Sequence, residues 1–536
     1  MLRLTWVQPE DLIGHELRQA SQDGREPSAV AARWHAAGGP EAPAHAGASP
    51  RPASPYLRLL ATDLLDELAD LPSVLADDEP TDLTRIKSLC PDWPLGRSRG
   101  QSCLPQCLKG LGGTPRGDGG PPAHGGPPAH GGPPARAKPR VGEEPRAGEE
   151  PRAGEGGRWG HLPGRSGTGG GTPQTPGRAT TPRSAHPAHL EAAWLGRAAG
   201  CLLGKPVEKL PLTGIRQLAR ATGNWPLTTY FTAHGVPEDL LTRYPWNRRS
   251  ATTSLAENID GMPEDDDLNY PLLNLLVLQR HGRAFTPTDV ARVWLDELPA
   301  GRTFTAERVA YRNLLSGLEP PLTARHHNPF REWIGALIRA DVHGWTNPGD
   351  PAAAAEQAHR DATLTHTANG VYAAMFTAAV IATAATGDHD VHACLRAGLT
   401  VVPPRSRLAR AVHQAIRLAH EHTDFDTVVD LLHGAYAATH HWVHAVPNTA
   451  LIAAALTHAD GDFTGSICRA VSGGWDTDSN GATAGSIAAL LAGSRRALPE
   501  RWTAPLKNRL ATSVGDFHGT GFDTLARLTH LEATRP

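Results

Sequence analysis

Glycine and proline concentrate in one internal segment of this chain. Residues 111–180 contain 21 Gly and 13 Pro and only four large apolar side chains. Such a segment cannot bury enough apolar surface to offset the entropy lost on ordering. Its short repeats, GGPPAH and EEPRAG, are far shorter than the periods of about 20–50 residues found in solenoids. We therefore expect a disordered linker over residues 99–186, which leaves two segments able to fold.

The segment before this linker predicts a small helical module. Leu57, Leu60, Leu64 and Leu68 recur at helical spacing between two prolines. The first 98 residues are therefore expected to form a module of a few helices, whose role the residues do not indicate.

The segment after the linker, residues 187–536, predicts an all-α domain. Stretches such as 405–422 have the period of a helix, and almost none alternates as a strand does. Alanine is abundant over 362–387, and small side chains let helix axes approach closely. One large helical bundle is expected here.

Charge and composition exclude some partners. Lys+Arg number 52 and Asp+Glu 55, a net charge of -3, so no basic excess favours a nucleic-acid backbone or an anionic membrane surface. No run has the apolar length of a signal peptide or a membrane span. The six cysteines show no disulfide framework, and Cys103 with Cys107 lacks a second pair for zinc. We expect a soluble, cytoplasmic protein.

Three glycines recur every four residues in WLGRAAGCLLGKPVE. On a helix, Gly196, Gly200 and Gly204 share one face, which favours a close helix crossing. A phosphate-binding loop is excluded because one spacer residue is missing and Pro206 stands where Ser or Thr binds magnesium. Glu208 is expected just beyond the end of this helix.

The first of two acidic clusters lies in GMPEDDDLNYPLLNLLVL. Glu264, Asp265, Asp266 and Asp267 immediately precede an apolar helical run. Pro271 is expected near the first turn of that helix, because deeper in a helix proline costs about 3 kcal/mol. The carboxylates therefore lie at a helix N-terminus.

The second cluster lies more than two hundred residues later, in SGGWDTDSNGATAGSI. Asp476, Asp478 and Ser479 precede another helix, and the preceding glycines bend the chain sharply. Alternate residues of such a turn can direct Asp476 and Asp478 to one point while Thr477 faces elsewhere.

Helix capping is one explanation of both clusters, since Asp and Ser are favoured N-caps. One carboxylate suffices for a cap, however, and three consecutive aspartates repel one another unless they lie in open solvent or around a cation. The apolar sequence after each cluster favours a shared metal site. Carboxylate and hydroxyl oxygens are hard ligands, which predicts magnesium, manganese or calcium and not zinc.

Four motifs together resemble the ADP-ribosylglycohydrolase family, which includes dinitrogenase-reductase-activating glycohydrolase and the ADP-ribosyl-arginine and ADP-ribosyl-serine hydrolases. They are AAWLGRAAGCLLGKPVE, the first acidic cluster, LTHTANGVYAAMF and GGWDTDSNGATAGSI, between Leu190 and about Gly493. The resemblance implies a large orthogonal all-α bundle with two Mg²⁺ ions, or Mn²⁺ in their place. It also implies that the bundle binds the ribose of an ADP-ribosyl group and cleaves its anomeric bond.

The resemblance also implies the metal ligands. The family's late ligands match Asp476, Asp478 and Ser479, and its early Thr-Asp-Asp set matches Asp265, Asp266 and Asp267, with Asp in place of the usual Thr. If the register shifts by one residue, the early ligands are Glu264, Asp265 and Asp266.

Roles in chemistry and binding follow from the same comparison. Glu208 matches an acidic residue proposed as acid/base in some members, and either Glu208 or Asp476 is expected to accept the proton of the attacking water. His366 and Asn369 match a region close to the substrate. Tyr270 and Trp475 flank the acidic clusters and are candidates to stack on adenine.

Three functions remain open at this point. The first is a magnesium-dependent hydrolase that releases ADP-ribose from an acceptor. The second is a protein that binds ADP-ribose or a related nucleotide without turnover, since the Asp in place of Thr changes the metal centre. The third is a metal-dependent hydrolase of another ribosyl or phosphorylated metabolite. The motifs of dehydrogenases, serine hydrolases and zincins are absent from the sequence.

Overall fold

The computed structural model describes residues 7–42, 46–49, 52–94 and 186–535. Over these residues the secondary structure is helical, with two isolated β-bridges and no strand. The predicted all-α class is therefore confirmed. The predicted linker lies outside the described residues except for His186. No helix of the described residues is both long and apolar enough to cross a membrane.

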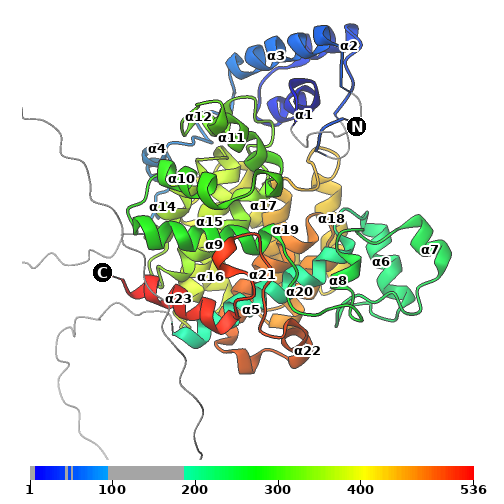
Figure 1. The fold of residues 1–536 in the computed structure, drawn as a ribbon, viewed down its shortest axis with the longest axis vertical. Helices are drawn as coiled ribbons and strands as arrows, with labels where there is room; N and C mark the ends of the chain where they lie inside the picture. Colours follow the sequence, from blue (N-terminus) through cyan, green and yellow to red (C-terminus); the bar gives the residue numbers. More distant parts are fainter. Residues whose placement is uncertain (1–6, 43–45, 50–51, 95–185, 536) are drawn as a thin grey trace, which may run out of the picture. The chain divides into compact units, whose positions relative to one another are not determined.

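Four helices form the N-terminal module, the name used here for the described part of residues 7–94. Their bounds are α1 Pro9–Gln22, α2 Ser28–Ala36, α3 Pro55–Asp70 and α4 Leu83–Leu89. Helix α3 contains the predicted leucine repeat and packs beside α1 (Figure 1), burying Leu64 and Leu68. The module belongs to the same compact unit as the helices after the linker.

The remaining helices form the helical domain, residues 186–535. Its first half contains α5 Pro187–Gly204, α6 Leu212–Ala221, α7 Glu238–Arg243, α8 Ala251–Ser254, α9 Asp266–His281, α10 Pro287–Glu297, α11 Thr305–Leu315, α12 Leu322–Arg325, α13 Asp341–Trp345 and α14 Pro351–Ala362. Its second half contains α15 Ala368–Ala384, α16 Val391–Leu399, α17 Arg407–Glu421, α18 Phe425–Tyr436, α19 Ala445–His458, α20 Phe463–Ser472, α21 Thr477–Ala492, α22 Glu500–Thr503 and α23 Phe522–Thr534.

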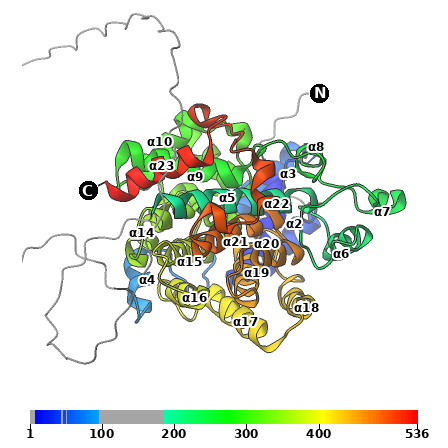
Figure 2. The same ribbon diagram turned by 90° about the horizontal axis from the view of Figure 1, so that it is seen from below.

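Helices α5 and α21 pack side by side with their backbones in contact (Figure 1 and Figure 2). A Cβ atom at Gly200 would overlap the carbonyl oxygen of Gly481, and one at Gly196 would overlap that of Gly485. The predicted glycine face therefore lets two helix backbones touch. Because α5 ends and α21 begins at the same place, the crossing brings the sequence after Gly204 next to the second acidic cluster.

Proline 271 lies deeper in its helix than predicted, as the sixth residue of α9. A proline has no N–H to donate to the carbonyl four residues earlier, which here belongs to Asp267. The Arg197 Nε of α5 donates to that carbonyl oxygen at 2.7 Å. The hydrogen bond that the proline removes is thus replaced by one that joins α5 to α9.

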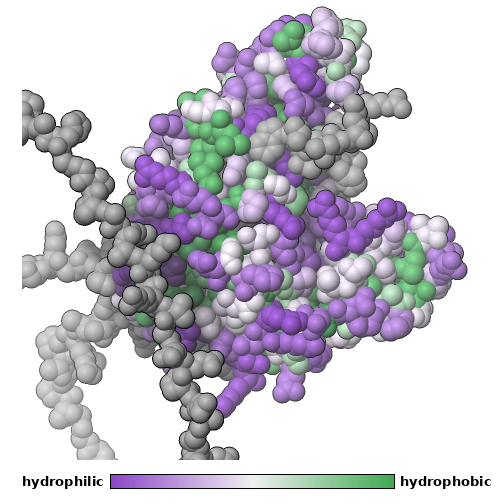
Figure 3. All heavy atoms as spheres, in the orientation of Figure 1, coloured by the Kyte–Doolittle hydropathy of each residue, from purple (hydrophilic) through white to green (hydrophobic). Residues whose placement is uncertain are grey.

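Apolar side chains on the surface are dispersed. Figure 3 shows hydrophilic residues over most of one face, with smaller hydrophobic areas between them. The strongly exposed apolar side chains belong to separate helices, among them Leu59 on α3, Leu315 on α11 and Leu531 on α23. Scattered exposure of this kind is ordinary for a folded protein.

Candidate functional site

Both acidic clusters line one cavity of about 540 Å³. Glu264, Asp265 and Asp266 enter it from the start of α9, and Asp478 and Ser479 enter it from the start of α21 together with Asp476. The predicted convergence of two distant patches of negative charge is therefore confirmed.

Glu208 completes the carboxylate group on one side of this cavity. Oxygens of Glu208, Asp476 and Asp478 lie within 4.8 Å of one another. The α5–α21 crossing holds them there, because the Thr477 hydroxyl donates to the carbonyl oxygen of Gly204 at 2.8 Å. Thr477 thus points away from the cavity, as its place between two inward-facing aspartates predicts.

Two side chains hold the Glu208 carboxylate in place. Asn247 Nδ2 donates to Oε2 at 2.7 Å, and Lys209 Nζ lies 2.7 Å from Oε1. Both neighbours also line the cavity. With each oxygen engaged by a donor, Glu208 has one preferred orientation beside the aspartates.

The turn before α21 has an unusual backbone. Gly474 and Trp475 have φ values of 77° and 57°, in the left-handed region that a tryptophan rarely adopts. Trp475 is held by stacking on His433, with ring centroids 4.2 Å apart, and does not line the cavity. Asn448 Oδ1 then accepts from the Asp476 N–H at 3.2 Å, which secures the residue that follows the turn.

Burial and mutual repulsion raise the pKa values of these aspartates. Burial first, and then the charge of Asp478, raises the pKa of Asp476 well above its usual range. Burial and the charge of Glu208 raise the pKa of Asp478 to about 7. The pKa of Asp266 is raised by burial, by Asp265 and by Asp478. So much negative charge in one place is a setting that a divalent cation would stabilise.

Lysine 205 lies within the same carboxylate group. Its Nζ pairs with the Asp265 carboxylate and donates to the Glu264 carbonyl oxygen at 3.3 Å. Asp265 in addition accepts from the Asp267 N–H at 2.9 Å, so it also caps α9. No motif predicted a role for Lys205. The signal that could have indicated one is its position between Gly204, at the end of α5, and Glu208.

Asp267 lies away from the cavity. Its carboxylate is buried against α5, 3.3 Å from Arg197 Nη2 and 3.7 Å from Cys201 Sγ. The carboxylates that reach the cavity from this cluster are instead those of the shifted register, Glu264, Asp265 and Asp266. Glu264 is paired with Arg302 at 2.6 Å.

The predicted substrate residues Tyr270, His366 and Asn369 are buried in the core and do not line the cavity. Tyr270 packs on Trp294, with ring centroids 5.3 Å apart. His366 Nδ1 lies 2.6 Å from Thr365 Oγ1. Asn369 Nδ2 donates at 2.9 Å both to Glu332 and to Glu79 of the N-terminal module.

Aromatic and cationic side chains form the rest of the cavity wall. The aromatic ones are Phe304, Trp333, His441 and Trp442, and the cationic ones outside the acidic clusters include Lys209, Arg249 and Arg302. The Trp333 and His441 rings are stacked, with centroids 4.3 Å apart and planes 11° apart. No motif marked these residues, which lie in segments without recognisable periodicity.

Comparison with known proteins gives one family match. The model of the ADP-ribosylglycohydrolase family matches residues 183–535, about two thirds of the chain. A solved structure named "ADP-ribosylglycohydrolase-related protein complex" is 21% identical, with a TM-score of 0.39, over 65% of this chain and 97% of its own. A search of the curated proteins gives no match. The motifs that form the cavity all lie within the matched residues, and the chain belongs to the ADP-ribosylglycohydrolase family.

Proposed function

We propose that this protein hydrolyses the glycosidic bond between ADP-ribose and an acceptor at a centre of two Mg²⁺ ions. Membership of the family already makes it a glycohydrolase of ADP-ribose linkages. The single observation that supports the metal centre is the common cavity of Asp265, Asp266, Asp476 and Asp478.

The donor set fits magnesium. We assign the metal-binding role to Asp265 and Asp266 of the first cluster and to Asp476, Asp478 and Ser479 of the second. All offer hard oxygen ligands, and there is neither a thiolate nor a histidine among them. Bound magnesium would offset the carboxylate charge and polarise the oxygens of the ribose and of the attacking water. Asp267 has a different task, because its ion pair with Arg197 fixes the start of α9.

Glu208 is the proposed general base. Its carboxylate faces the cavity beside Asp476 and Asp478, and Asn247 and Lys209 orient it. Cleavage at ribose C1 passes through an oxocarbenium-like state and needs a base within hydrogen-bond reach of a water. Glu208 takes a proton from that water as the water oxygen bonds to C1, the bond from C1 to the acceptor breaks, and the protonated Glu208 passes the proton on to the leaving acceptor. Asp476 is the alternative base, but its neighbours are mostly carboxylates, which favours a ligand role.

The aromatic and cationic residues of the cavity wall suit the remainder of the substrate. Phe304, Trp333 and Trp442 offer flat apolar surface to a purine, and Arg249 and Arg302 offer charge to a diphosphate. We therefore assign contact with the ADP portion to these residues. Tyr270, His366 and Asn369 are proposed to act indirectly, by supporting the helices behind the cavity.

A turnover assay tests the proposal. Release of ADP-ribose is measured from ADP-ribosylated arginine, serine and nucleic acid, with magnesium and with a chelator. We expect at least one of these substrates to release ADP-ribose, and to do so only when magnesium is present. We also expect Glu208→Gln to lower kcat by a factor of about 10²–10⁴. The exposed Glu238 of α7 supplies the matched control Glu238→Gln, which should keep full activity. Absence of release from every substrate, or unchanged turnover in the chelator, would refute the proposal.

A further inference from the structure

We infer that the N-terminal module is part of the substrate site: it supplies one wall residue, Ala46, and positions the stacked Trp333–His441 pair. The family match begins at residue 183, so the module lies outside it. This inference rests on the proposed function, since it concerns affinity for the same substrate. It makes the module a determinant of substrate binding and not of bond cleavage.

Ala46 lines the cavity together with the acidic clusters. The chain contacts α1 at Ser49 and at Ala42. The Ser49 N–H donates to Asp11 Oδ1 at 2.7 Å. At Gly14 the helix leaves room for the chain, because a Cβ there would lie 2.6 Å from the Ala42 nitrogen. The path of residues 46–49 is therefore set by α1.

His15 of α1 packs behind the aromatic wall. Its ring lies edge-on to Trp333 and to His441, with centroids 5.9 Å and 6.1 Å apart, and it also contacts Phe330 at 5.2 Å. His15 is buried, and neither of its ring nitrogens has a hydrogen-bond partner among the described residues. The imidazole therefore packs as an apolar group against two rings that line the cavity.

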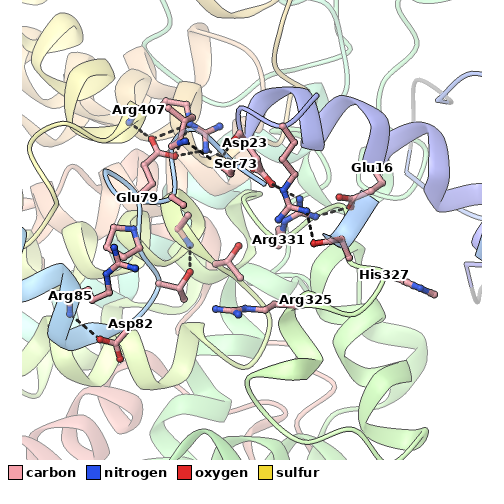
Figure 4. Close-up of a pocket in the computed structure, with 18 of the residues that line it drawn as sticks. Glu16, Asp23, Ser73, Glu79, Asp82, Arg85, Arg325, His327, Arg331 and Arg407 are labelled. Carbon is pink, nitrogen blue, oxygen red and sulfur yellow. Dashed lines mark hydrogen bonds and ion pairs between the residues drawn. The ribbon is translucent and has the colours of Figure 1, made fainter. Parts of the chain in front are cut away.

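Ion pairs lock α1 to the residues next to Trp333. Arg331 pairs with Glu16 at 2.7 Å and with Asp23, as Figure 4 shows. Gln19 Nε2 donates to Glu332 Oε2 at 2.8 Å. Because Arg331 and Glu332 directly precede Trp333, these contacts fix the backbone from which the tryptophan projects.

The same backbone is joined to the segment that carries His441. The Ile334 N–H donates to the Val443 carbonyl oxygen, and the Ala445 N–H donates to the Glu332 carbonyl oxygen, both at 2.9 Å. These two hydrogen bonds join the segments that carry Trp333 and His441, and His15 of α1 packs against both rings.

A second cavity, of about 470 Å³, lies along this junction and is the one drawn in Figure 4. Of the module carboxylates that line it, Asp82 caps α4, and the other three have partners in the helical domain. Glu16 and Asp23 face Arg331, and Glu79 faces Arg407 at 2.6 Å. These charges therefore join the module to the domain.

The module meets the cavity through Ala46 and packs against Trp333 and His441 through His15, whereas the proposed base and metal ligands lie on other segments. A change at Ala46 or His15 should therefore alter KM and the Kd for ADP-ribose and leave kcat nearly constant. A merely structural role would instead lower kcat and the amount of active enzyme together.

The first experiment uses the full chain with Ala46→Phe and its matched control Ala48→Phe. Ala48 is half-buried in the same segment but does not line the cavity. We expect Ala46→Phe to raise KM and the calorimetric Kd for ADP-ribose about tenfold, with kcat within about twofold of the wild type, and Ala48→Phe to change neither. Equal effects of the two substitutions, or an effect of Ala46→Phe on kcat alone, would overturn the inference.

The second experiment needs no substrate. Hydrogen exchange of residues 331–334 and 441–445 is compared between His15→Ala and His35→Ala, whose histidine is exposed on α2. We expect faster exchange only in His15→Ala, and unchanged exchange would overturn the inference. If the wild type releases no ADP-ribose, the proposed function fails by that result alone. The exchange data then still show whether α1 stabilises the segments that carry Trp333 and His441.

Discussion

At the scale of single residues, the cavity concentrates negative charge that the fold offsets only in part. Three cations offset part of this charge: Lys205 pairs with Asp265, Lys209 with Glu208, and Arg302 with Glu264. Burial and repulsion raise the pKa of Asp478 to about 7, so the charged form is held at a cost in free energy. A divalent cation would remove that cost.

Asp478→Asn tests two effects of the Asp478 charge: the repulsion that destabilises the fold and the binding of a metal ion. The substitution removes one hard ligand and one charge, so we expect the calorimetric affinity for Mn²⁺ or Mg²⁺ to fall at least about tenfold. In a chelator the same variant should melt at a higher temperature than the wild type, because less repulsion remains. Asp239→Asn, on the surface of α7, is the control. Unchanged metal affinity would rule Asp478 out as a ligand.

His15 should make the protein sensitive to mild acid. Burial, and then the nearby charge of Arg18, lowers the pKa of His15 to about 4, against about 6.5 in an unfolded chain. Between these pH values the unfolded state binds a proton that the folded state does not, so stability falls as the pH drops below about 6.5 and is unaffected above it. At pH 5 the protonation of His15 in the unfolded state lowers the free energy of unfolding by about 2 kcal/mol.

His15→Phe keeps a ring and removes this titration. Thermal melts at pH 7.5 and pH 5 should show a smaller drop in Tm for the variant than for the wild type. The other buried histidines, such as His440, whose pKa burial lowers to about 3, are present in both proteins and cancel in the comparison. Equal drops would mean that His15 does not remain neutral in the folded state.

At the scale of helices, the crossing of α5 and α21 places the site. Gly200 and Gly481 bring the two backbones into contact, and the Thr477–Gly204 hydrogen bond aligns their ends. The end of α5 leads to Glu208 and the start of α21 carries Asp476, so a shift of either helix would move two carboxylates relative to each other.

Gly200→Ala should therefore reduce both stability and turnover. The added methyl group meets backbone, which cannot move aside as a side chain can, and we expect a loss of at least about 2 kcal/mol. Gly434 of α18 is the control, because a Cβ there meets nothing within 4 Å. Gly434→Ala should instead stabilise its helix by about 1 kcal/mol. Chemical denaturation and the turnover assay measure both effects, and a neutral Gly200→Ala would contradict the close crossing.

At the scale of the whole molecule, the N-terminal module and the helical domain form one compact unit although the sequence separates them widely. Arg331 and Glu332 of the domain are buried at the junction, and Arg407 is partly buried there. Arg331 pairs with Glu16 of the module, and Arg407 pairs with Glu79. We expect calorimetry to record a single unfolding transition for the two. A separate transition of the module at lower temperature would contradict this cooperativity.

Arg331→Met tests the same junction. It leaves the buried Glu16 without its ion-pair partner and removes one partner of the partly buried Asp23, and breaking such a buried pair typically costs about 3–5 kcal/mol. The exposed pair of Arg417 and Glu421, 3.0 Å apart on α17, provides the control Arg417→Gln, expected to change stability by less than about 1 kcal/mol. Similar denaturation midpoints for the two variants would show that the junction contributes little.

The local features of this molecule could be predicted because each depends on residues close together in the chain. The three glycines predict a close crossing from the helical period alone, and Asp476 and Asp478 predict two carboxylates on one side of a turn. The leucines of α3 predict its buried face in the same way.

The sequence does not predict which way a side chain points where that orientation depends on residues far away in the chain. His366 and Asn369 lie close to helical sequence in a family motif, yet the Glu332 and Glu79 carboxylates draw Asn369 into the core. Trp333 and His441 line the cavity although they lie more than one hundred residues apart and in no motif.

The sequence by itself determined the helical class, the positions of the main helices and the residues that form the two acidic clusters, because helix period and turn preference act within a few residues. Only the tertiary structure decided that Asp266 faces the cavity while Asp267 faces Arg197, and that α1 stands behind Trp333. These outcomes depend on contacts between segments tens to hundreds of residues apart, whose geometry is set when the whole core packs and carries no local signal.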